Sequence, residues 1–274
     1  MIKLRTMIRE WGPIKNYRAK RQLYGEPSRV LALPFWFVWD RMRYGRFAPY
    51  VTRARTIQGW IRGPELIALI RASASLDPNP VIVEIGSFMG CSTALLAGGR
   101  QLQGSGIVHC VDQFDAGGND FPTPIYHDIR HNNPMTLRQQ FEHNIKKAGL
   151  SDYVVVHQCL GHEAAQDWQQ PIDLLFSDGE FSEEGARRIY ESWLPHLKPG
   201  GILMLHNSTA ESADHRGNTI LARKHVRPPH FDAIQLFGST TFARKRREIS
   251  KGLYKSPLGM FCLFLWQIGE IYSV

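Results

Sequence analysis

The feature that most constrains the fold is the segment 81–97, VIVEIGSFMGCSTALLA. It opens with β-branched apolar residues, which are typical of a central strand in a parallel sheet, and it closes with a helical composition. Gly86 and Gly90 lie between the two parts and allow a sharp turn in which the backbone can approach a ligand closely. The N–H groups that open the helix face the same place. The segment therefore predicts a binding site at the end of the first core strand, although two glycines alone also fit a turn that binds nothing.

Three further apolar runs also end in polar residues. They are residues 107–111 before Asp112, residues 172–176 before Ser177 and Asp178, and residues 202–205 before His206 and Asn207. Ligands of open α/β sheets bind outside the carboxyl ends of the strands, so these ends are expected to converge on one crevice. Asp112 follows about one βαβ unit after the first strand, where an acid can bind both hydroxyls of a ribose.

Two further turn-forming segments help to predict the fold class. Residues 198–201, Lys-Pro-Gly-Gly, are expected to stop a helix and launch a strand. Residues 233–245 predict two strands around Gly238 and Ser239, which form an antiparallel hairpin. The sequence thus predicts an α/β fold with a doubly wound, mostly parallel sheet and a C-terminal antiparallel hairpin.

Four strings of this chain resemble a known family. VEIGSFMGCST, VHCVDQFD, IDLLFSDGEFSEEGARRIYESWLPHLKPGG and ILMLHNS are similar to class I S-adenosylmethionine-dependent methyltransferases. Within that class they resemble small-molecule O-methyltransferases of the catechol type and of the sugar-modifying type in antibiotic pathways. The resemblance covers residues 59–207, and GWIRGPELIALI is similar to the lid-bearing helix that precedes the fold. It implies methyl transfer to a hydroxyl of a small molecule that is sugar-like or a secondary metabolite.

The resemblance also implies roles for individual residues. Glu84 would order the turn and the methionine amino end, Asp112 would hold the ribose hydroxyls, and Asp178 would lie near the sulfonium. The other implied cofactor contacts are Gly86 and Phe88 at the cofactor edge, Ser92 and Thr93 at its carboxylate, and Leu160, Gly161 and His162 on the adenine side.

Catalysis and metal binding are expected at the ends of the last two parallel strands. His206 is the predicted general base, because imidazole titrates near neutral pH; the alternative is a buried structural histidine. Asp178, which the resemblance places near the sulfonium, is the second predicted catalytic residue. Catechol-type relatives hold a divalent ion at positions matched here by Asp178 and Asn207. An imidazole suits Mg²⁺ poorly, since that ion prefers oxygen ligands. A Mg²⁺-assisted site and a metal-free site both remain open.

The charge is unevenly distributed along the chain. Residues 1–62 hold 14 Lys and Arg against 3 Asp and Glu, a net charge of +11, whereas residues 63–215 hold 9 against 19, a net charge of −10. Residues 216–274 hold 10 against 3, a net charge of +7. We therefore expect a basic aromatic cap at 1–58, a methyltransferase domain at 59–248 and an apolar tail at 249–274.

Two other functions follow from these flanks. They could dock a macromolecular acceptor for methylation, or they could make the chain a catalytically degenerate cofactor-binding scaffold. Nucleic acid is disfavoured as a partner, because the sequence has no zinc-ligand spacing and no RNA-binding motif. The apolar run 260–266 is too short to cross a bilayer. Three roles of this run remain open: it could contact a membrane surface, form a homo-oligomer contact or pack on its own domain.

The cysteines and the N-terminal residues indicate a cellular compartment, and one segment is expected to form a loop. Cys91, Cys110, Cys159 and Cys262 show neither metal-binding nor disulfide spacing, which favours a reducing compartment. The N-terminal residues build no secretory signal, so a cytoplasmic location is expected. The polar, proline-rich segment 119–134 is expected to form a loop that closes over the acceptor.

Overall fold

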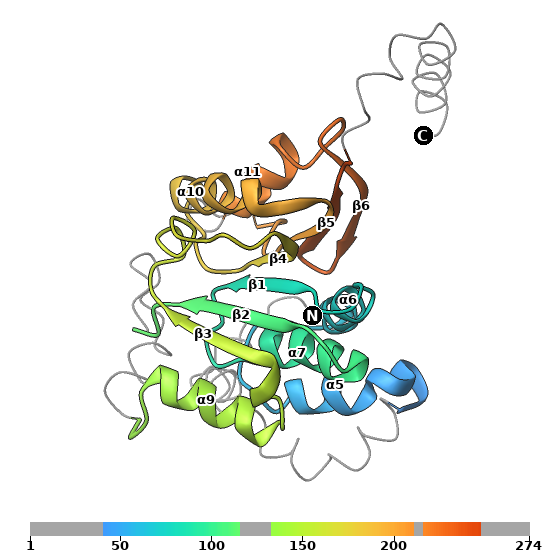
Figure 1. Ribbon diagram of the computed structural model, residues 1–274, viewed down its shortest axis with the longest axis vertical. Coiled ribbons are helices and arrows are strands. Elements are labelled where there is room, and N and C mark those ends of the chain that lie inside the picture. Colours follow the sequence, from blue (N-terminus) through green and yellow to red (C-terminus); the bar gives the residue numbers. More distant parts are fainter. Residues whose placement is uncertain (1–40, 116–132, 211–215, 248–274) are drawn as a thin grey trace, which may run out of the picture.

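The computed structural model describes residues 41–115, 133–210 and 216–247, which form a seven-stranded sheet flanked by helices (Figure 1). The strand order is β3-β2-β1-β4-β5-β7-β6; β1 to β5 are parallel, and β7 runs antiparallel to both of its neighbours. The strands are β1 (Val81–Ile85), β2 (Ile107–Asp112), β3 (Val154–Gln158), β4 (Ile172–Ser177), β5 (Leu197–Leu205), β6 (Phe231–Phe237) and β7 (Thr240–Lys245). The predicted fold class, including the C-terminal hairpin around Gly238 and Ser239, is confirmed.

The helices of the described residues cover both faces of the sheet. One face carries α5 (Ala48–Ala54), α6 (Pro64–Ala74), α7 (Cys91–Gln103) and α9 (Leu137–Lys147), and the other carries α10 (Glu183–Trp193) and α11 (Gly217–Lys224). Short 3-10 turns lie at Gly45–Phe47, Ser151–Tyr153 and Leu194–His196. Alternate residues of each buried strand supply the two cores: Ile82 packs on the α7 side, whereas Val83 and Ile85 pack on the α10 side. This two-faced burial explains why the central parallel strands β1 and β4 are mostly apolar.

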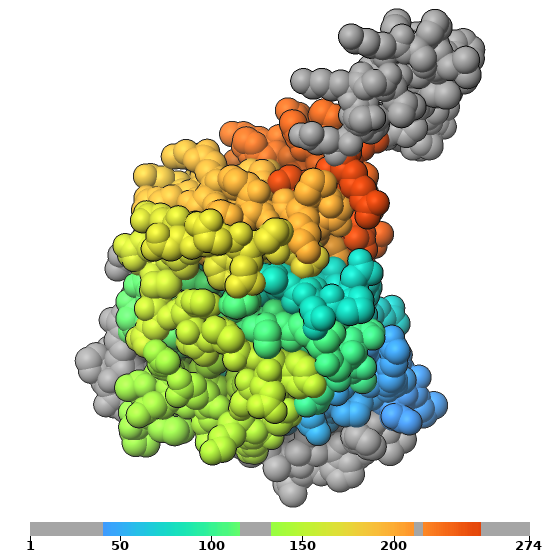
Figure 2. All heavy atoms as spheres, in the orientation of Figure 1, coloured from blue at the N-terminus to red at the C-terminus, as the bar shows by residue number. Residues whose placement is uncertain are grey.

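The described part of the predicted N-terminal cap packs into the domain core. Tyr50 of α5 lies so close to α7 that a Cβ added to Gly98 would approach its ring to 2.4 Å. The Cys91 thiol contacts the carbonyl oxygen of Ala54 at 3.4 Å. In Figure 2 the blue residues of this stretch lie beside the green residues of α7. The predicted boundary at residue 58 therefore falls within one continuous hydrophobic core.

The start of β5 differs from the prediction. Lys-Pro-Gly-Gly at 198–201 was expected to precede the strand, yet β5 begins at Leu197 and includes these residues. The β4–β5 pairing shifts register here, since Ile172 pairs with Leu197 and Leu174 pairs with Ile202. Gly200 has φ +84, a conformation that favours glycine. The four residues therefore form an irregular opening of the strand.

Several predicted features lie wholly or largely outside the described residues. They are most of the basic cap, nearly all of the loop 119–134, the apolar tail and Cys262. Cys91, Cys110 and Cys159 are free thiols, as predicted. Within the described ranges, the helices all fall short of the length and apolarity needed to cross a bilayer.

His109 on β2 and His157 on β3 form a pair from which we predict acid sensitivity of the fold. Nδ1 of His109 lies 3.0 Å from Nε2 of His157, and Trp168 packs edge-on against both rings. Burial, together with the charge of His157, lowers the pKa of His109 to about 4, and burial lowers the pKa of His157. The unfolded chain, with a histidine pKa of about 6.5, therefore binds more protons than the folded chain below that pH. The contribution of this pair to the free energy of unfolding should therefore fall as the pH falls from about 6.5 to about 4.

The variant His109→Phe tests this expectation. Its melting temperature should fall less steeply than that of the wild type between pH 7 and pH 4.5, because a group that takes up a proton on unfolding has been removed. The exposed His143 on α9 provides the control, and His143→Phe should keep the wild-type slope. Equal slopes for His109→Phe and the wild type would refute the assignment.

Candidate active site

Polar residues follow three neighbouring parallel strands in one continuous row. Beyond the strand ends, the sheet hydrogen bonds continue from Gly86 N to Val111 O at 2.9 Å and from Asp178 N to Ile85 O at 2.8 Å. A third such bond joins His206 N to Ser177 O at 3.1 Å. Asp112 closes the adjacent strand β2. The structure thus brings together the strand ends that the sequence analysis expected to converge.

The turn after β1 is pressed against the end of β4. Gly86 has φ +85, and a Cβ at this position would lie 2.6 Å from the carbonyl oxygen of Asp178 and 2.6 Å from Cα of Gly179. Only glycine fits here, for reasons of both space and backbone conformation. Gly90, with φ +92, is the N-cap of α7 and ends the turn.

Glu84 is fully buried and holds this turn from below. Its Oε2 accepts hydrogen bonds from Ser87 Oγ at 2.9 Å and from Thr93 Oγ1, while its Oε1 has no partner among the described residues. Burial raises the pKa of Glu84, and hydrogen bonds from Ser92, Thr93 and Ser87 act in the opposite direction. A buried acceptor without a donor is costly, so Oε1 is a place where a ligand's N–H group would be stabilised.

Thr93 of α7 differs from the prediction in the direction that its hydroxyl faces. Ser92 and Thr93 were expected to contact the cofactor carboxylate, but Thr93 is fully buried and its Oγ1 donates a hydrogen bond to Glu84 Oε2. The first partner of Thr93 is therefore the acid that orders the turn, while the role of Ser92 stays a prediction. The start of α7 can still attract a ligand carboxylate through its backbone N–H groups, because the N-cap residue is Gly90 and makes no side-chain hydrogen bond to them.

Asp112 also organises the turn. Its Oδ2 accepts from the backbone N–H groups of Ser87 at 2.8 Å and Phe88 at 2.9 Å, and its Oδ1 accepts from Phe114 N at 2.7 Å. Burial raises the pKa of Asp112, against the lowering effect of these backbone hydrogen bonds. A carboxylate offers about four acceptor positions, so room for a ligand hydroxyl remains beside these three bonds.

The predicted edge and adenine-side residues lie around the same strand ends. Phe88 has φ +48, and its ring lies 4.9 Å from that of Trp60, an aromatic neighbour that the sequence analysis did not identify. A Cβ on Gly161 would lie 2.8 Å from Cγ2 of Ile85, which places the loop after β3 against the end of β1. Leu160 and His162 flank Gly161 and are partly exposed.

Asp178 and His206 form a hydrogen-bonded pair across β4 and β5. His206 Nδ1 lies 2.6 Å from Asp178 Oδ1, and its Nε2 lies 3.7 Å from Oε1 of Glu65. Burial by itself would lower the pKa of His206, but the charge and hydrogen bond of Asp178, with the charge of Glu65, raise it overall. The His206 side chain is 2% exposed and that of Asp178 is 15% exposed. Asp178 is therefore the more accessible member of the pair.

Two functional neighbours of this pair were missed from the sequence. Glu65 lies at the start of α6, more than 100 residues before Asp178, and nothing in its local pattern indicates a contact with β5. Asn218 of α11 donates from Nδ2 to the carbonyl oxygen of His206 at 2.8 Å and lies 3.4 Å from that of Ser177. It thereby joins the ends of β4 and β5 beyond their last sheet bonds.

The donor set at this site does not fit a divalent metal. Asp178 Oδ1 already forms a 2.6 Å hydrogen bond with His206 Nδ1, so this oxygen is not free to bind a metal ion. Mg²⁺ also requires about six oxygen ligands, of which Asp178 and Asn207 supply few. Among the residues that the structure describes, no group of three His, Cys, Asp or Glu side chains could hold a metal ion. The Mg²⁺ alternative and its ligands Asp178 and Asn207 thus lack support from this geometry.

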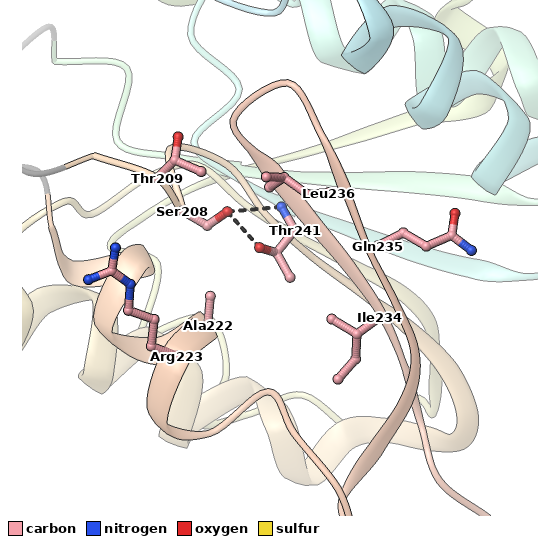
Figure 3. Close-up of a pocket in the computed structure, with 8 residues that line it drawn as sticks. All are labelled: Ser208, Thr209, Ala222, Arg223, Ile234, Gln235, Leu236 and Thr241. Carbon is pink, nitrogen blue, oxygen red and sulfur yellow. Dashed lines mark hydrogen bonds between the residues drawn. The ribbon is translucent and has the colours of Figure 1, made fainter. Parts of the chain in front are cut away.

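A shallow hollow of about 360 Å³ lies beside the end of β5 (Figure 3). It is lined by Ser208, Thr209, Ala222, Arg223, Ile234, Gln235, Leu236 and Thr241. Ser208 Oγ accepts from Thr241 N at 3.0 Å and lies 2.7 Å from Thr241 Oγ1, which fixes its inner wall. The hollow is formed by α11, β6, β7 and the residues after β5, and it is separate from the turn after β1.

Comparison with known proteins agrees with this geometry. Residues 83–208 match the model of a family described as a methyltransferase domain. The O-methyltransferase TomG from Streptomyces achromogenes, solved in complex with SAM and described as involved in tomaymycin synthesis, is 14% identical with a TM-score of 0.53. That match covers 77% of this chain and 95% of TomG. Cofactor-bound Rv0187 from MTB is 16% identical with a TM-score of 0.50, over 86% of this chain and 97% of that one.

At such identities the similarity to solved structures shows a shared fold. The family match adds that the turn after β1, Asp112, Asp178 and His206 all lie within the matched segment. Residues 83–208 are therefore similar to a methyltransferase domain, and the fold of the described residues is the one that these solved structures share.

Proposed function

We propose that this protein is an S-adenosylmethionine-dependent O-methyltransferase that acts on a hydroxyl of a small molecule, sugar-like or a secondary metabolite. One observation carries the proposal: the glycine turn lies directly beside the Asp178–His206 pair, and below it a buried oxygen of Glu84 has no hydrogen-bond partner among the described residues. The first element suits a nucleoside with a cationic amino acid end, and the second suits proton transfer from a hydroxyl. The described function of TomG as an O-methyltransferase gives further support.

Each residue of the turn has a binding role in this proposal. Glu84 Oε1 accepts a hydrogen bond from the amino group of the methionine part, which removes its unsatisfied state. Asp112 uses its remaining acceptor position for a ribose hydroxyl, while it continues to hold the turn. When bound, the cofactor supplies a methyl group made electrophilic by its sulfonium.

The acceptor is deprotonated at Asp178 in this mechanism. With an acceptor hydroxyl held beside Asp178, the carboxylate of this residue would take up the hydroxyl proton, and the bound cofactor would supply the methyl group that the acceptor oxygen gains. His206 was predicted as the direct base, but it is 2% exposed and both of its ring nitrogens face carboxylates. We therefore assign Asp178 the contact with the acceptor and His206 the task of orienting Asp178 through Nδ1.

Radiolabelled transfer tests the proposal. The wild-type chain is incubated with methyl-labelled S-adenosylmethionine and a panel of catechols, sugars and other alcohols, with bulk RNA and protein as further acceptors. Label is expected in small-molecule hydroxyls, and its transfer should persist in EDTA because the donor set does not fit a metal ion. The basic flanks would favour a macromolecular acceptor if label entered only RNA or protein. Cofactor binding without transfer to any acceptor would favour a degenerate scaffold.

A further inference from the structure

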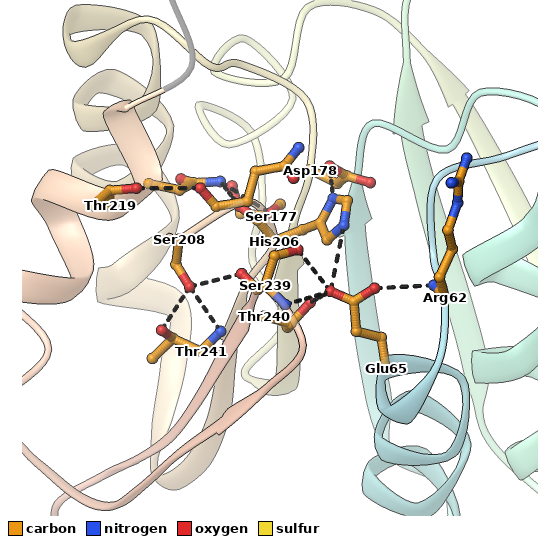
Figure 4. A network of polar contacts seen from close by, with 12 residues as sticks. Arg62, Glu65, Ser177, Asp178, His206, Ser208, Thr219, Ser239, Thr240 and Thr241 are labelled. Carbon is orange, nitrogen blue, oxygen red and sulfur yellow. Dashed lines mark hydrogen bonds and ion pairs between the residues drawn. The ribbon is translucent and has the colours of Figure 1, made fainter. Parts of the chain in front are cut away.

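Glu65 is a buried carboxylate that joins three parts of the fold. It lies in the first turn of α6 and is 4% exposed. Its Oε2 accepts from Arg62 N at 2.9 Å, and its Oε1 accepts from Ser239 N at 2.9 Å, Ser239 Oγ at 2.7 Å and Thr240 Oγ1 at 3.1 Å (Figure 4). These contacts bind the start of α6 to the turn between β6 and β7.

The same oxygen faces the ring of His206. Oε1 lies 3.7 Å from Nε2, so the imidazole stands between Glu65 on one side and Asp178 on the other. A buried carboxylate is costly unless hydrogen bonds and an opposite charge compensate it. The hydroxyl and N–H donors of the β6–β7 turn supply the hydrogen bonds, and the Nε2 side of the His206 ring faces the same oxygen at 3.7 Å.

This arrangement selects one orientation of the ring. A half-turn about the Cβ–Cγ bond exchanges ring nitrogens for ring carbons, so the flipped ring would lose its hydrogen bond to Asp178 and its approach to Glu65 together. If Glu65 were absent, the ring would keep its hydrogen bond to Asp178 and lose the contact on its Nε2 side. The turn between β6 and β7 is also packed tightly on Glu65, since a Cβ on Gly238 would lie 2.9 Å from its Cγ.

We propose that Glu65 is a positioning residue for the acceptor site: it fixes the His206 ring from the Nε2 side and so keeps Nδ1 directed at Asp178. The inference rests on the proposed methyltransferase function for its consequence in catalysis, while its structural part can be tested without turnover. It makes the first turn of α6 and the β6–β7 turn supports of the reacting carboxylate, although neither touches the acceptor.

The test compares Glu65→Gln and Glu65→Ala with the wild type. Proton NMR follows the exchange with water of the Nδ1–H of His206, and labelled transfer gives kcat and the KM for S-adenosylmethionine. Exchange should be slowest in the wild type, faster in Glu65→Gln, whose neutral amide holds the ring less strongly, and fastest in Glu65→Ala. The kcat should fall about tenfold or more in Glu65→Ala, which corresponds to about 1.4 kcal/mol or more, and it should fall less in Glu65→Gln. The KM for S-adenosylmethionine should change by less than about twofold in both variants.

A matched control separates this effect from a general one. Glu183→Gln changes an exposed glutamate in the first turn of α10, where it pairs with Arg216 at 3.7 Å, and should leave exchange and kcat unchanged. If Glu65→Ala does not fold, Glu65→Gln decides alone. Wild-type exchange and kcat in Glu65→Gln would then overturn the inference. A wild type without transfer activity would refute the proposed function, while the exchange rates would still test Glu65.

Discussion

Replacing Gly86 by alanine is expected to weaken the binding of S-adenosylmethionine strongly and to destabilise the fold. The new Cβ would lie 2.6 Å from backbone atoms of Asp178 and Gly179, which cannot move without displacing β4. The backbone at φ +85 adds about 1–2 kcal/mol for a residue with a side chain, and overpacking adds about 1–3 kcal/mol. Isothermal titration should show at least about a hundredfold loss of affinity, since roughly 2.8 kcal/mol corresponds to that factor. Urea denaturation measures the loss of unfolding free energy.

Gly104→Ala provides the control for backbone strain alone. Gly104 ends α7 with φ +72, and a Cβ there would meet nothing within 4 Å. This variant should lose about 1–2 kcal/mol of unfolding free energy and bind the cofactor as the wild type does. If Gly86→Ala bound as tightly as Gly104→Ala, the close packing of the turn on Asp178 would have no role in holding the ligand.

Asp178→Asn is expected to lower kcat by a factor of about 10² to 10⁴, the range for loss of a general acid or base. An amide cannot accept the hydroxyl proton, and it no longer provides a charged partner for His206 Nδ1. The dissociation constant for S-adenosylmethionine should change far less, because the turn after β1 keeps its own hydrogen bonds. Single-turnover transfer measures the first quantity and titration the second.

An Asp→Asn substitution at an exposed position provides the control for Asp178→Asn. Asp232 on β6 is exposed and pairs with Arg246 at 3.7 Å, so Asp232→Asn should leave kcat unchanged. Near-wild-type turnover in Asp178→Asn would remove Asp178 from the reaction and leave the proton without the acceptor that we assign to it.

The parts of the fold that could be predicted are those fixed by local composition. Mostly apolar runs mark β1 and β4, because a central parallel strand is buried on both faces and most of its side chains must be apolar. Gly86 and Gly90 mark the turn because its backbone requires positive φ. Gly238 and Ser239 mark the hairpin, and the structure places them between β6 and β7.

The parts that could not be predicted depend on contacts between distant residues. Glu65 meets Ser239 across 174 positions, so its role appears only when α6 packs beside the β6–β7 turn. Thr93 looks like a ligand contact at a helix start, but the depth of Glu84 below the turn draws its hydroxyl inward. His206 has the residue type of a base, yet its burial and its two carboxylate neighbours decide its state. Residue type gave the position of the site, and packing determined which group within it is accessible.

The most direct test of the central claim is a crystal structure of the chain soaked with S-adenosylhomocysteine. We predict density over the turn after β1, with the amino group of the ligand at Glu84 Oε1, a ribose hydroxyl at Asp112 and the sulfur facing Asp178. An empty turn, or density confined to the hollow beside Ser208, would contradict the account.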